Sequence, residues 1–331
     1  MAYQSDVVLT SRIRLARNYD DLPFQMNKSS NIATVCIQRT LGALELEGLT
    51  ESFVMRRMDN LERNEQKCLV ESHLISKDLL KTPEVSAVLL NEERGLSIMM
   101  NEEDHIRLQV LLPHQQLAAA MQVAFGLEDA LQRHLKFAFD PQLGYLTACP
   151  TNTGTGMRAS LMMHLPMLTK FKQMGNVTQS LAKVGLTIRG MYGEGSEALG
   201  NVYQVSNQVT LGRTEQEILE AVTAVSRQLT DTERELRGKV ADADKLALED
   251  QAFRAYGTLK FARRIVQTEF MKLWSDLRLG AALEKLPLTT DDCDALLEAA
   301  QDAHVIAWAE KPLSGSELNE ARASRIRELI K

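Results

Sequence analysis

The sequence is poor in the features that mark several large classes of protein. Its 331 residues include only four cysteines, Cys36, Cys68, Cys149 and Cys293, and none of them forms a C-x-x-C pair. Zinc sites and disulfide frameworks depend on suitably spaced cysteines, so neither is expected here. We predict that all four are reduced thiols.

Long apolar runs and an excess of basic residues are missing too. No segment approaches the roughly 20 consecutive apolar residues that a membrane helix needs, and the N-terminus lacks the basic and then apolar pattern of a secretory signal. The formal net charge of −6 argues against nucleic acid as the main partner. We therefore expect a cytoplasmic protein that binds neither a membrane nor nucleic acid.

The common nucleotide-binding motifs are also absent. The sequence has no G-x-x-x-x-G-K-[ST], no G-x-G-x-x-G that opens a helix after a strand, and no H-R-D or D-F-G motif. The loop from Gly190 to Gly200 is rich in glycine and carries Glu194, but turns use glycine for the same conformational reasons. If a phosphate group is bound, arginine side chains must hold it.

Arginines recur on one face of several predicted strands. Side chains alternate across a strand, so Arg12 and Arg14 share one face of the strand at 6–15, and the reverse face is apolar. Four predicted strands show this pattern, and their arginines are Arg12, Arg14, Arg107, Arg158 and Arg189. A solvated edge with its arginines in water explains one such strand. Four in a single domain favour a convergent anion site.

Three carboxylates lie side by side in the run N-E-E-D-H at 101–105. Such a cluster is unfavourable unless a cation, a metal or a substrate compensates it. If the strand at 104–112 extends back to Glu103, the alternation places Glu103, His105 and Arg107 on one face. A salt bridge between Glu103 and Arg107 is the purely structural interpretation.

The run from Cys149 to Ser160, C-P-T-N-T-G-T-G-M-R-A-S, is the stretch around which we expect the site to form. Its small residues suit a tight backbone beside a ligand. Arg158 and Cys149 are side chains that meet anionic and guanidinium groups, although Cys149 alone is better explained as a small buried hydrophobe. The methionines of the strand that follows are expected in the core.

The order of predicted elements indicates an α+β domain followed by a helical one. Further strands are predicted at 51–58, 68–74, 85–90, 95–100, 157–164, 186–190 and 201–211. Helices are predicted at 29–48, 114–137, 166–183 and 214–237, the last opened by a capping box of Thr214 and Glu217. After about residue 240 only helical patterns remain, at 247–254, 259–277, 291–302 and 317–330, and Ser314 with Glu317 predicts a capping box for the last.

These motifs resemble the signatures of the phosphagen (guanidino) kinases, which transfer the γ-phosphoryl of ATP to a guanidinium nitrogen. The similar runs are S-R-I-R-L-A-R at 11–17, N-E-E-D-H-I-R at 101–107, C-P-T-N at 149–152 and T-G-M-R-A-S at 155–160. They occur in matching order within about residues 6–235. The runs H-L-I-S at 73–76 and R-G-M-Y-G-E-G-S-E-A-L-G-N at 189–201, together with the helical tail, are similar to the bacterial protein-arginine kinase branch.

The resemblance implies a phosphagen-kinase-like catalytic domain at 1–240, mainly an antiparallel sheet flanked by helices, and a small all-helical domain at 241–331 that makes a homodimer. Members that act on small molecules usually carry a helical domain ahead of the catalytic one. Because the matching motifs begin here at Ser11, we expect a substrate presented on a protein. The alternatives are a kinase of a free guanidino compound such as arginine, and a catalytically idle adaptor.

Site residues follow from the same resemblance, position by position. The catalytic base falls on Glu103, a second guanidinium-gripping carboxylate on Glu194 and the reactive thiol on Cys149. Glu102 corresponds to a carboxylate that meets Mg²⁺ through water, and His73 lies on the adenine side. The implied ATP-binding residues are Ser11, Arg12, Ile13, Arg14, His73, Arg107, Arg158, Ala159, Ser160, Leu161, Met162, Arg189, Gly190, Met191, Tyr192 and Gly193.

The implied partners are proteins with exposed arginines, an activator protein, a stress-gene repressor and a Clp-type ATPase. Two departures from the family are visible. Met162 stands where some members have histidine. The run L-N-E-A-R-A from Leu318 to Ala323 stands where the branch often has the phosphoarginine-sensing motif R-D-x-x-R-A, which puts activation by phosphoarginine in doubt.

Overall fold

One large antiparallel sheet forms the centre of the molecule. The structure is a computed structural model, and it describes residues 6–24, 30–191, 198–240 and 242–330. The strand order is β2-β3-β4-β5-β1-β8-β10-β9, with every neighbouring pair antiparallel. These strands are β1 (Val8–Arg17), β2 (Val54–Arg57), β3 (Ala87–Asn91), β4 (Leu96–Met100), β5 (Ile106–Pro113), β8 (Met157–His164), β9 (Leu186–Gly190) and β10 (Val202–Asn207). A small hairpin of β6 (Phe139–Asp140) and β7 (Gly144–Tyr145) lies apart from the sheet.

Helices cover one face of the sheet and form the main core with it. The apolar side chains that alternate along the central strands, such as Ile13, Leu15 and Leu161, are completely buried in this core. Residues of the flanking helices complete it, and the elements on this side are α1 (Ser30–Leu46), α3 (Leu117–Gln132), α4 (Pro166–Lys170), α5 (Met174–Lys183) and α6 (Glu215–Gly238). Met157 and Met163 lie in this core, as the sequence predicted.

The described residues cover the opposite face at its two ends. Near β3 and β4, a small apolar cluster forms between the sheet and the segment that contains α2 (Arg63–Glu71), with Leu79 packed on Val88 and Met99. At the other end, Leu9 and Met162 join the apolar cluster of the C-terminal helices. The part of this face that lies between the two covers carries the arginines.

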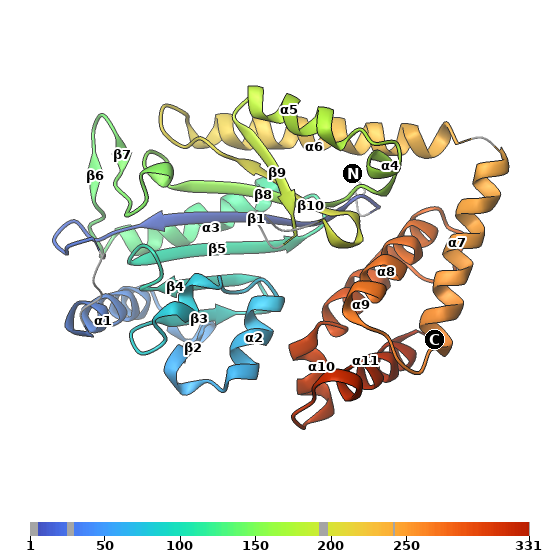
Figure 1. Cartoon of the computed structure of the whole chain (residues 1–331). Coiled ribbons are helices and arrows are strands. Elements are labelled where there is room, and N and C mark those ends of the chain that lie inside the picture. Colours follow the sequence, from blue (N-terminus) through green and yellow to red (C-terminus); the bar gives the residue numbers. More distant parts are fainter. Residues whose placement is uncertain (1–5, 25–29, 192–197, 241, 331) are drawn as a thin grey trace.

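The C-terminal region is helical and packs against one end of the sheet (Figure 1). Its helices are α7 (Asp242–Phe261), α8 (Gln267–Ala282), α9 (Thr290–Ala299), α10 (Asp302–Ala309) and α11 (Gly315–Leu329). Phe270 and Trp274 are fully buried at its centre. The expected architecture, an antiparallel sheet flanked by helices and followed by a helical region, is confirmed.

Two polar contacts bind this region to α2 and to the sheet. Glu71 of α2 accepts hydrogen bonds from the first backbone amides of α10, those of Ala303 and His304, at 3.0 to 3.3 Å. Across the molecule, the Ser275 hydroxyl on α8 meets His164 Nε2 and Asn201 Nδ2, each at 2.8 Å.

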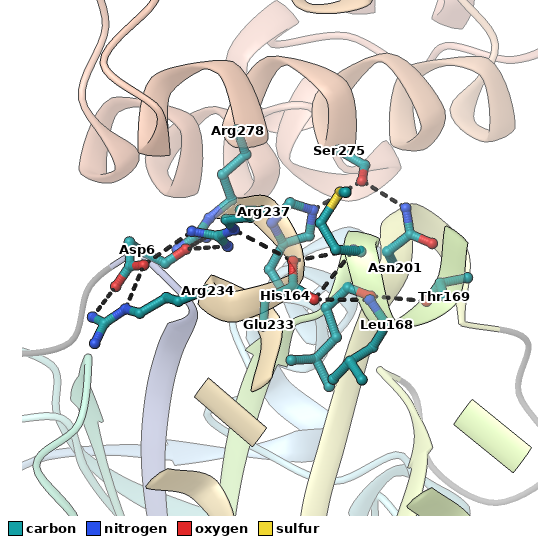
Figure 2. Close-up of polar contacts among 12 residues, drawn as sticks. Asp6, His164, Leu168, Thr169, Asn201, Glu233, Arg234, Arg237, Ser275 and Arg278 are labelled. Carbon is teal, nitrogen blue, oxygen red and sulfur yellow. Dashed lines mark hydrogen bonds and ion pairs between the residues drawn. The ribbon is translucent and has the colours of Figure 1, made fainter. Parts of the chain in front are cut away.

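An ionic network around the buried Arg278 reinforces the second contact (Figure 2). Arg278 of α8, completely buried, donates to the backbone oxygen of Asp6 at 2.9 Å and pairs with Asp294 of α9 at 2.6 Å. The Asp6 carboxylate in turn pairs with Arg234 and Arg237 of α6. The network therefore joins the start of the chain, the last sheet-covering helix and the helical region.

The structure corrects several predicted boundaries. Residues 68–74 are not a strand, because α2 occupies 63–71 and Glu65 caps its first turn by accepting from the Glu62 backbone amide at 2.8 Å. The predicted helix at 166–183 is split into α4 and α5, with Lys172 at a φ of 56° between them.

Further corrections concern the C-terminal region and β5. The predicted helix at 259–277 spans the end of α7, a connecting loop and most of α8, while α10 was not predicted. Ser314 begins α11 without a side-chain capping bond, so its capping box was predicted wrongly. Strand β5 begins only at Ile106, so Glu103 does not belong to a strand.

Two further sequence predictions, on the cysteines and on the start of α6, agree with the fold. All four cysteines are free. Thr214 and Glu217 form the predicted capping box at the start of α6. Among the residues described, we find no helix with the length and apolarity required to cross a membrane.

The buried carboxylate of Glu233 on α6 provides a test of this packing. It accepts from the backbone amides of Met167 and Leu168 at 3.0 to 3.1 Å and is completely buried. Glu233→Ala should lower the free energy of unfolding by about 3 kcal/mol, because two buried donors lose their acceptor. Urea denaturation followed by circular dichroism measures it.

The matched control is Glu235→Ala on the same helix, which removes an exposed ion pair with Lys239. It should change the free energy of unfolding by less than about 0.5 kcal/mol, as surface substitutions usually do. Equal losses in the two variants would contradict the assigned role of Glu233.

Candidate active site

Arginine side chains gather on the open face of the sheet. The pairing of β1 with β8 places Arg14 opposite Arg158 and Arg12 opposite Ser160. Residues directly opposite in a sheet point to the same side, so these arginines share one face. On β5, Gln109 lies opposite Arg14 and so points to the same side of the sheet. Arg107 lies two residues from Gln109, opposite Ala16, and therefore points to that side as well.

These guanidinium groups disfavour one another's charge. Burial, followed by the charges of Arg158 and Arg107, lowers the pKa of Arg12 to about 10. The pKa of Arg14 is lowered well below its usual value, again by burial first and then by neighbouring arginines. The buried Nε of Arg14 meets no hydrogen-bond acceptor within the described part of the chain. An anion bound among these groups would relieve both the repulsion and the missing hydrogen bond.

Two of the three carboxylates in the run at 101–105, those of Glu102 and Asp104, are buried, and the third, that of Glu103, faces a cavity. Glu102, 2% exposed, accepts from Ser76 Oγ at 2.6 Å and pairs with Arg107 Nη1 at 2.5 Å. Asp104, also 2% exposed, accepts from Asn18 Nδ2 and from the backbone amide of Ala148, each at 2.7 Å. Asp104 thereby positions the backbone that leads directly into Cys149.

Glu103 is the acid that remains accessible. It lies in the turn between β4 and β5, and its Oε2 is 3.2 Å from Arg107 Nη2. Partial burial raises the pKa of Glu103, against the influence of Arg107, and the nearby acids raise it further. The predicted salt bridge is therefore present, but the strand geometry predicted for it is wrong, because the fully buried His105 points elsewhere and accepts from the Tyr19 backbone amide.

A cavity of about 220 Å³ brings several of the expected residues together. Its walls include Arg14, Glu103, Arg107, Cys149 and Arg158. Cys149 is partly exposed there, and its Sγ lies 3.0 Å from Thr151 Oγ1. These five expected residues, three cationic, one acidic and one thiol, thus converge from β1, β5, β8 and the connecting loops.

Sequence analysis missed other residues that line this cavity, among them Asp78, Thr151, Asn152 and Gly156. Asn152 Nδ2 lies 3.5 Å from Glu103 Oε2. Thr151 and Asn152 belong to the run from Cys149 to Ser160, and their place in that run is the sequence feature that could have identified them. Asp78 carried no such signal, because it reaches the cavity from the distant segment after α2.

Tight backbone packing explains the glycines of the central run. Gly156 has a φ of 58°, and a Cβ there would lie 2.5 Å from Arg17 Nη1 and 2.7 Å from the Ala16 backbone oxygen. Arg17, 1% exposed, donates to the oxygens of Ala16 and Thr155 and pairs with Glu128. The third arginine of the S-R-I-R-L-A-R run therefore holds the loop before β8 in place.

Four of the residues expected to bind the nucleotide have side chains on the helix-covered side, namely Ser11, Ile13, Ala159 and Leu161. The last three belong to the core. The Ser11 hydroxyl donates to the His114 backbone oxygen at 2.6 Å and accepts from the Gln116 backbone amide at 2.8 Å, next to the start of α3. Only the backbone of these residues could face a ligand on the arginine side.

The other expected residues lie further along the open face. The row of paired residues Thr10, Met162, Gln204 and Arg189 runs across β1, β8, β10 and β9, so Arg189 shares the arginine face. His73 follows α2 with a φ of 58° and lines a cavity with Met162 and Met191. Gly190 is buried at the end of β9. Tyr192, Gly193 and Glu194 lie outside the described residues.

The acids of the site do not form a cage for a metal ion. Within the described ranges, no group of three or more histidine, cysteine, aspartate or glutamate residues could hold a metal. Glu102 uses one oxygen for Ser76 and Arg107 and the other for the Glu103 backbone amide at 2.9 Å. This donor set fits a cation held mainly by phosphate oxygens and met by Glu102 only through water.

Comparison with known proteins identifies the class to which this fold and site belong. Residues 34–236 match the family model of the ATP:guanido phosphotransferase C-terminal catalytic domain. The structure is similar to that of lombricine kinase, with a TM-score of 0.63 and 25% identity over 73% of this chain and 70% of that one. It shares its fold with the duplicated taurocyamine kinase of Schistosoma mansoni, with a TM-score of 0.64 and 23% identity over 77% of this chain and 39% of that one. The chain belongs to the ATP:guanido phosphotransferase family.

Within this family, relatives named protein-arginine kinase are similar over nearly the whole chain. The protein of that name from Symbiobacterium thermophilum is 44% identical over 98% of this chain and 93% of its own length. The protein-arginine kinase of Bacillus subtilis is 41% identical over 99% of this chain and 91% of its own length. Residues 245–331 also match the model of the protein-arginine kinase McsB C-terminal domain.

The repulsion among the arginines leads to a prediction about polyanions. Tripolyphosphate, which has neither base nor ribose, should raise the melting temperature of the wild type. Arg14→Met should raise the melting temperature of the ligand-free protein, because a buried unpaired charge is removed, and should reduce the shift caused by tripolyphosphate by roughly half or more. Scanning fluorimetry measures both.

Arg39→Met is the control, because Arg39 forms an exposed pair with Asp21 away from the arginine face. It should leave the shift caused by tripolyphosphate unchanged. An Arg14→Met variant that melts earlier than wild type and keeps the full shift would show that Arg14 is not held ready for an anion.

Proposed function

We propose that this chain is an ATP-dependent protein-arginine kinase, which transfers the γ-phosphoryl of ATP to the guanidinium of arginine residues in proteins. The observation that carries the proposal is the cavity in which Glu103, with a raised pKa, lies beside Arg14, Arg107 and Arg158. A site that joins a base to an anion-binding group of arginines suits a reaction between a cationic acceptor and a polyphosphate. The near-full-length similarity to protein-arginine kinases supports this choice of acceptor.

On the donor side, the arginines bind and orient the triphosphate. Their charges also stabilise the negative charge that spreads over the phosphoryl oxygens as it moves, which is the main task of a phosphoryl-transfer site. Glu102 would hold a Mg²⁺ ion beside the phosphates through its water ligands, and the ion would supply further positive charge there. The same face offers Ser160, Met162, Arg189 and the backbone near Gly190 to the remainder of the nucleotide.

On the acceptor side, Glu103 serves as the general base. A guanidinium has a pKa above about 12, so its nitrogen has no free lone pair at neutral pH. Glu103 takes one N–H proton while that nitrogen attacks the γ-phosphorus, the N–P bond forms, and the bond to the β-phosphate oxygen breaks to release ADP. The raised pKa of Glu103 suits a proton acceptor, since it holds a proton more strongly than an ordinary carboxylate would.

Two further groups are proposed to orient the guanidinium. Cys149 lies in the same cavity, and its sulfur would contact the planar acceptor. Glu194 is proposed as the second carboxylate on the basis of the sequence resemblance, and it would fix two N–H groups by paired hydrogen bonds.

The helical region is proposed as the site of dimerisation. We assign catalysis to residues 1–240 and association to 241–331. Large apolar side chains stay exposed at Leu246, Phe253 and Phe261, which are spaced to lie on one face of α7. The full chain should elute as a dimer in size-exclusion chromatography and a chain ending at residue 240 as a monomer, whereas a dimeric truncated chain would refute the assignment.

The cellular setting is proposed from the same resemblance. It comprises cytoplasmic protein quality control under stress, with an activator protein, a stress-gene repressor and a Clp-type ATPase as partners. Activation by phosphoarginine is not part of the proposal. Arg322 lies in the run at 318–323 that departs from the sensor motif, and it is 1% exposed. Its guanidinium donates to the backbone oxygens of Ala300 and Ile265 and to the side chain of Asn319, and it pairs with Asp302.

The base assignment gives a direct test of the proposed activity. The protein is incubated with radiolabelled Mg-ATP and either a denatured arginine-containing protein or free arginine, and acid-labile phosphate is measured in each. Wild type should label the denatured protein. Glu103→Gln should lower the rate at least about a hundredfold, in line with general-base catalysis, while the affinity for ATP changes little.

Glu93→Gln, in the exposed turn between β3 and β4, is the matched control and should be fully active. Labelling of free arginine in place of the protein would identify a free-guanidino kinase. Undiminished labelling by Glu103→Gln would remove Glu103 from the mechanism, and no labelling by wild type would favour an idle adaptor.

A further inference from the structure

A second cavity, of about 140 Å³, lies where three parts of the chain meet. The sheet contributes Leu9 and Met162, the segment after α2 contributes His73, and α9 contributes Leu297 and Glu298. This cavity is distinct from the one that contains Glu103, with which it shares no lining residue. Its walls therefore combine the catalytic sheet with the helical region.

The walls of this cavity are mainly apolar, with polar groups at a few places. Leu9, Met162 and Leu297 are buried and belong to one apolar cluster. The polar groups include the hydroxyl of Ser72, the imidazole of His73 and the carboxylate of Glu298. Burial lowers the pKa of His73 to about 4, so its ring is neutral at physiological pH and can stack on or donate to an uncharged ligand. This combination is typical of a site for a flat, mostly apolar organic group.

The cavity leads toward the arginines. A small neighbouring cavity shares Thr10, His73 and Met162 with it and adds Arg12 and Ser160. Thr10, Arg12 and Arg14 lie on one side of β1. The rise per residue of a strand places the Cα atoms of Thr10 and Arg14 roughly 13 Å apart. A ligand with a base in the cavity and a phosphate chain along β1 would therefore end among the arginines beside Glu103.

The contacts next to the cavity also hold the helical region in place. Ser72 and His73 lie at the end of α2, and the Ser72 hydroxyl bonds to Glu298 of α9 and meets His304 Nε2 of α10 at 3.1 Å. His304 pairs in turn with Glu71 at 3.0 Å. A ligand in the cavity would add its own contacts across this same junction.

We propose that α9 forms one wall of the binding pocket for the adenine base, with Leu297 as its main contact, so that nucleotide binding and the docking of the helical region stabilise each other. The inference rests on the proposed function, because it takes the ligand of the arginines to be ATP. It gives the helical region a part in the reaction in addition to association. By linkage, a ligand that contacts both parts strengthens their mutual packing by as much as that packing strengthens its binding.

The experiment compares a ligand that has a base with one that lacks it. Titration calorimetry on the full chain measures the affinity for Mg-ADP and for tripolyphosphate. Leu297→Ala should weaken Mg-ADP binding about tenfold, because the base loses apolar contact, and should leave tripolyphosphate binding within about twofold. Leu297→Trp, which fills the cavity without removing apolar surface, should abolish Mg-ADP binding and again spare tripolyphosphate.

Leu296→Ala is the matched control, because Leu296 is the adjacent residue of α9, is equally apolar and buried, and does not line the cavity. It should lower the melting temperature but keep Mg-ADP affinity within about twofold of wild type. Circular dichroism confirms that each variant is folded.

Unchanged Mg-ADP affinity in both Leu297 variants would overturn the inference while leaving the proposed function intact. Failure of wild type to bind either ligand would overturn the proposed function together with the inference.

Discussion

The mutual repulsion of arginines on one face of a β-sheet is the constraint on which the rest of this structure depends. Arg12, Arg14, Arg107 and Arg158 are held close together and partly buried, and the acids near them do not neutralise them all. The reverse side of the same strands is mostly apolar and packed against helices, so the strands cannot turn to release the charges. The core therefore stabilises an arrangement that is electrostatically unfavourable until an anion binds.

Alternation along a strand is a local property, and for this reason the sequence predicted the arginine face well. Predictions that depended on the path of the chain outside the strands were weaker. The segment at 68–74 was assigned to a strand, although its apolar residues belong to a capped helix and to the turn after it. The strand predicted at 104–112 would have included Glu103 if it extended back by one residue, yet Glu103 reaches the cavity from a turn. Asp78 and Leu297 line the two cavities through tertiary packing, which no short motif records.

The helical region is joined to α6 and to the residues before β1 by an ionic network around the buried Arg278, and to α2 by the contacts of Glu71 and His304. Glu71 and Asp294, one residue from each attachment, also line the cavity that Leu297 helps to form. The helices thus pack at the end of the sheet at which β1 begins, and the arginines of the same strand extend from there toward Glu103. Strand β1 therefore contributes to both cavities and also packs against the helical region.

The most direct measurement of the central claim is an experimental structure of the protein with Mg-ADP, nitrate and an arginine-containing peptide. Nitrate is planar and carries one negative charge, so it stands for the phosphoryl group in transit. The account predicts nitrate in contact with Arg14, Arg107 and Arg158, with the peptide guanidinium on one side of it hydrogen-bonded to Glu103 and ADP on the other. A nitrate bound away from these arginines, or a guanidinium that does not contact Glu103, would contradict it.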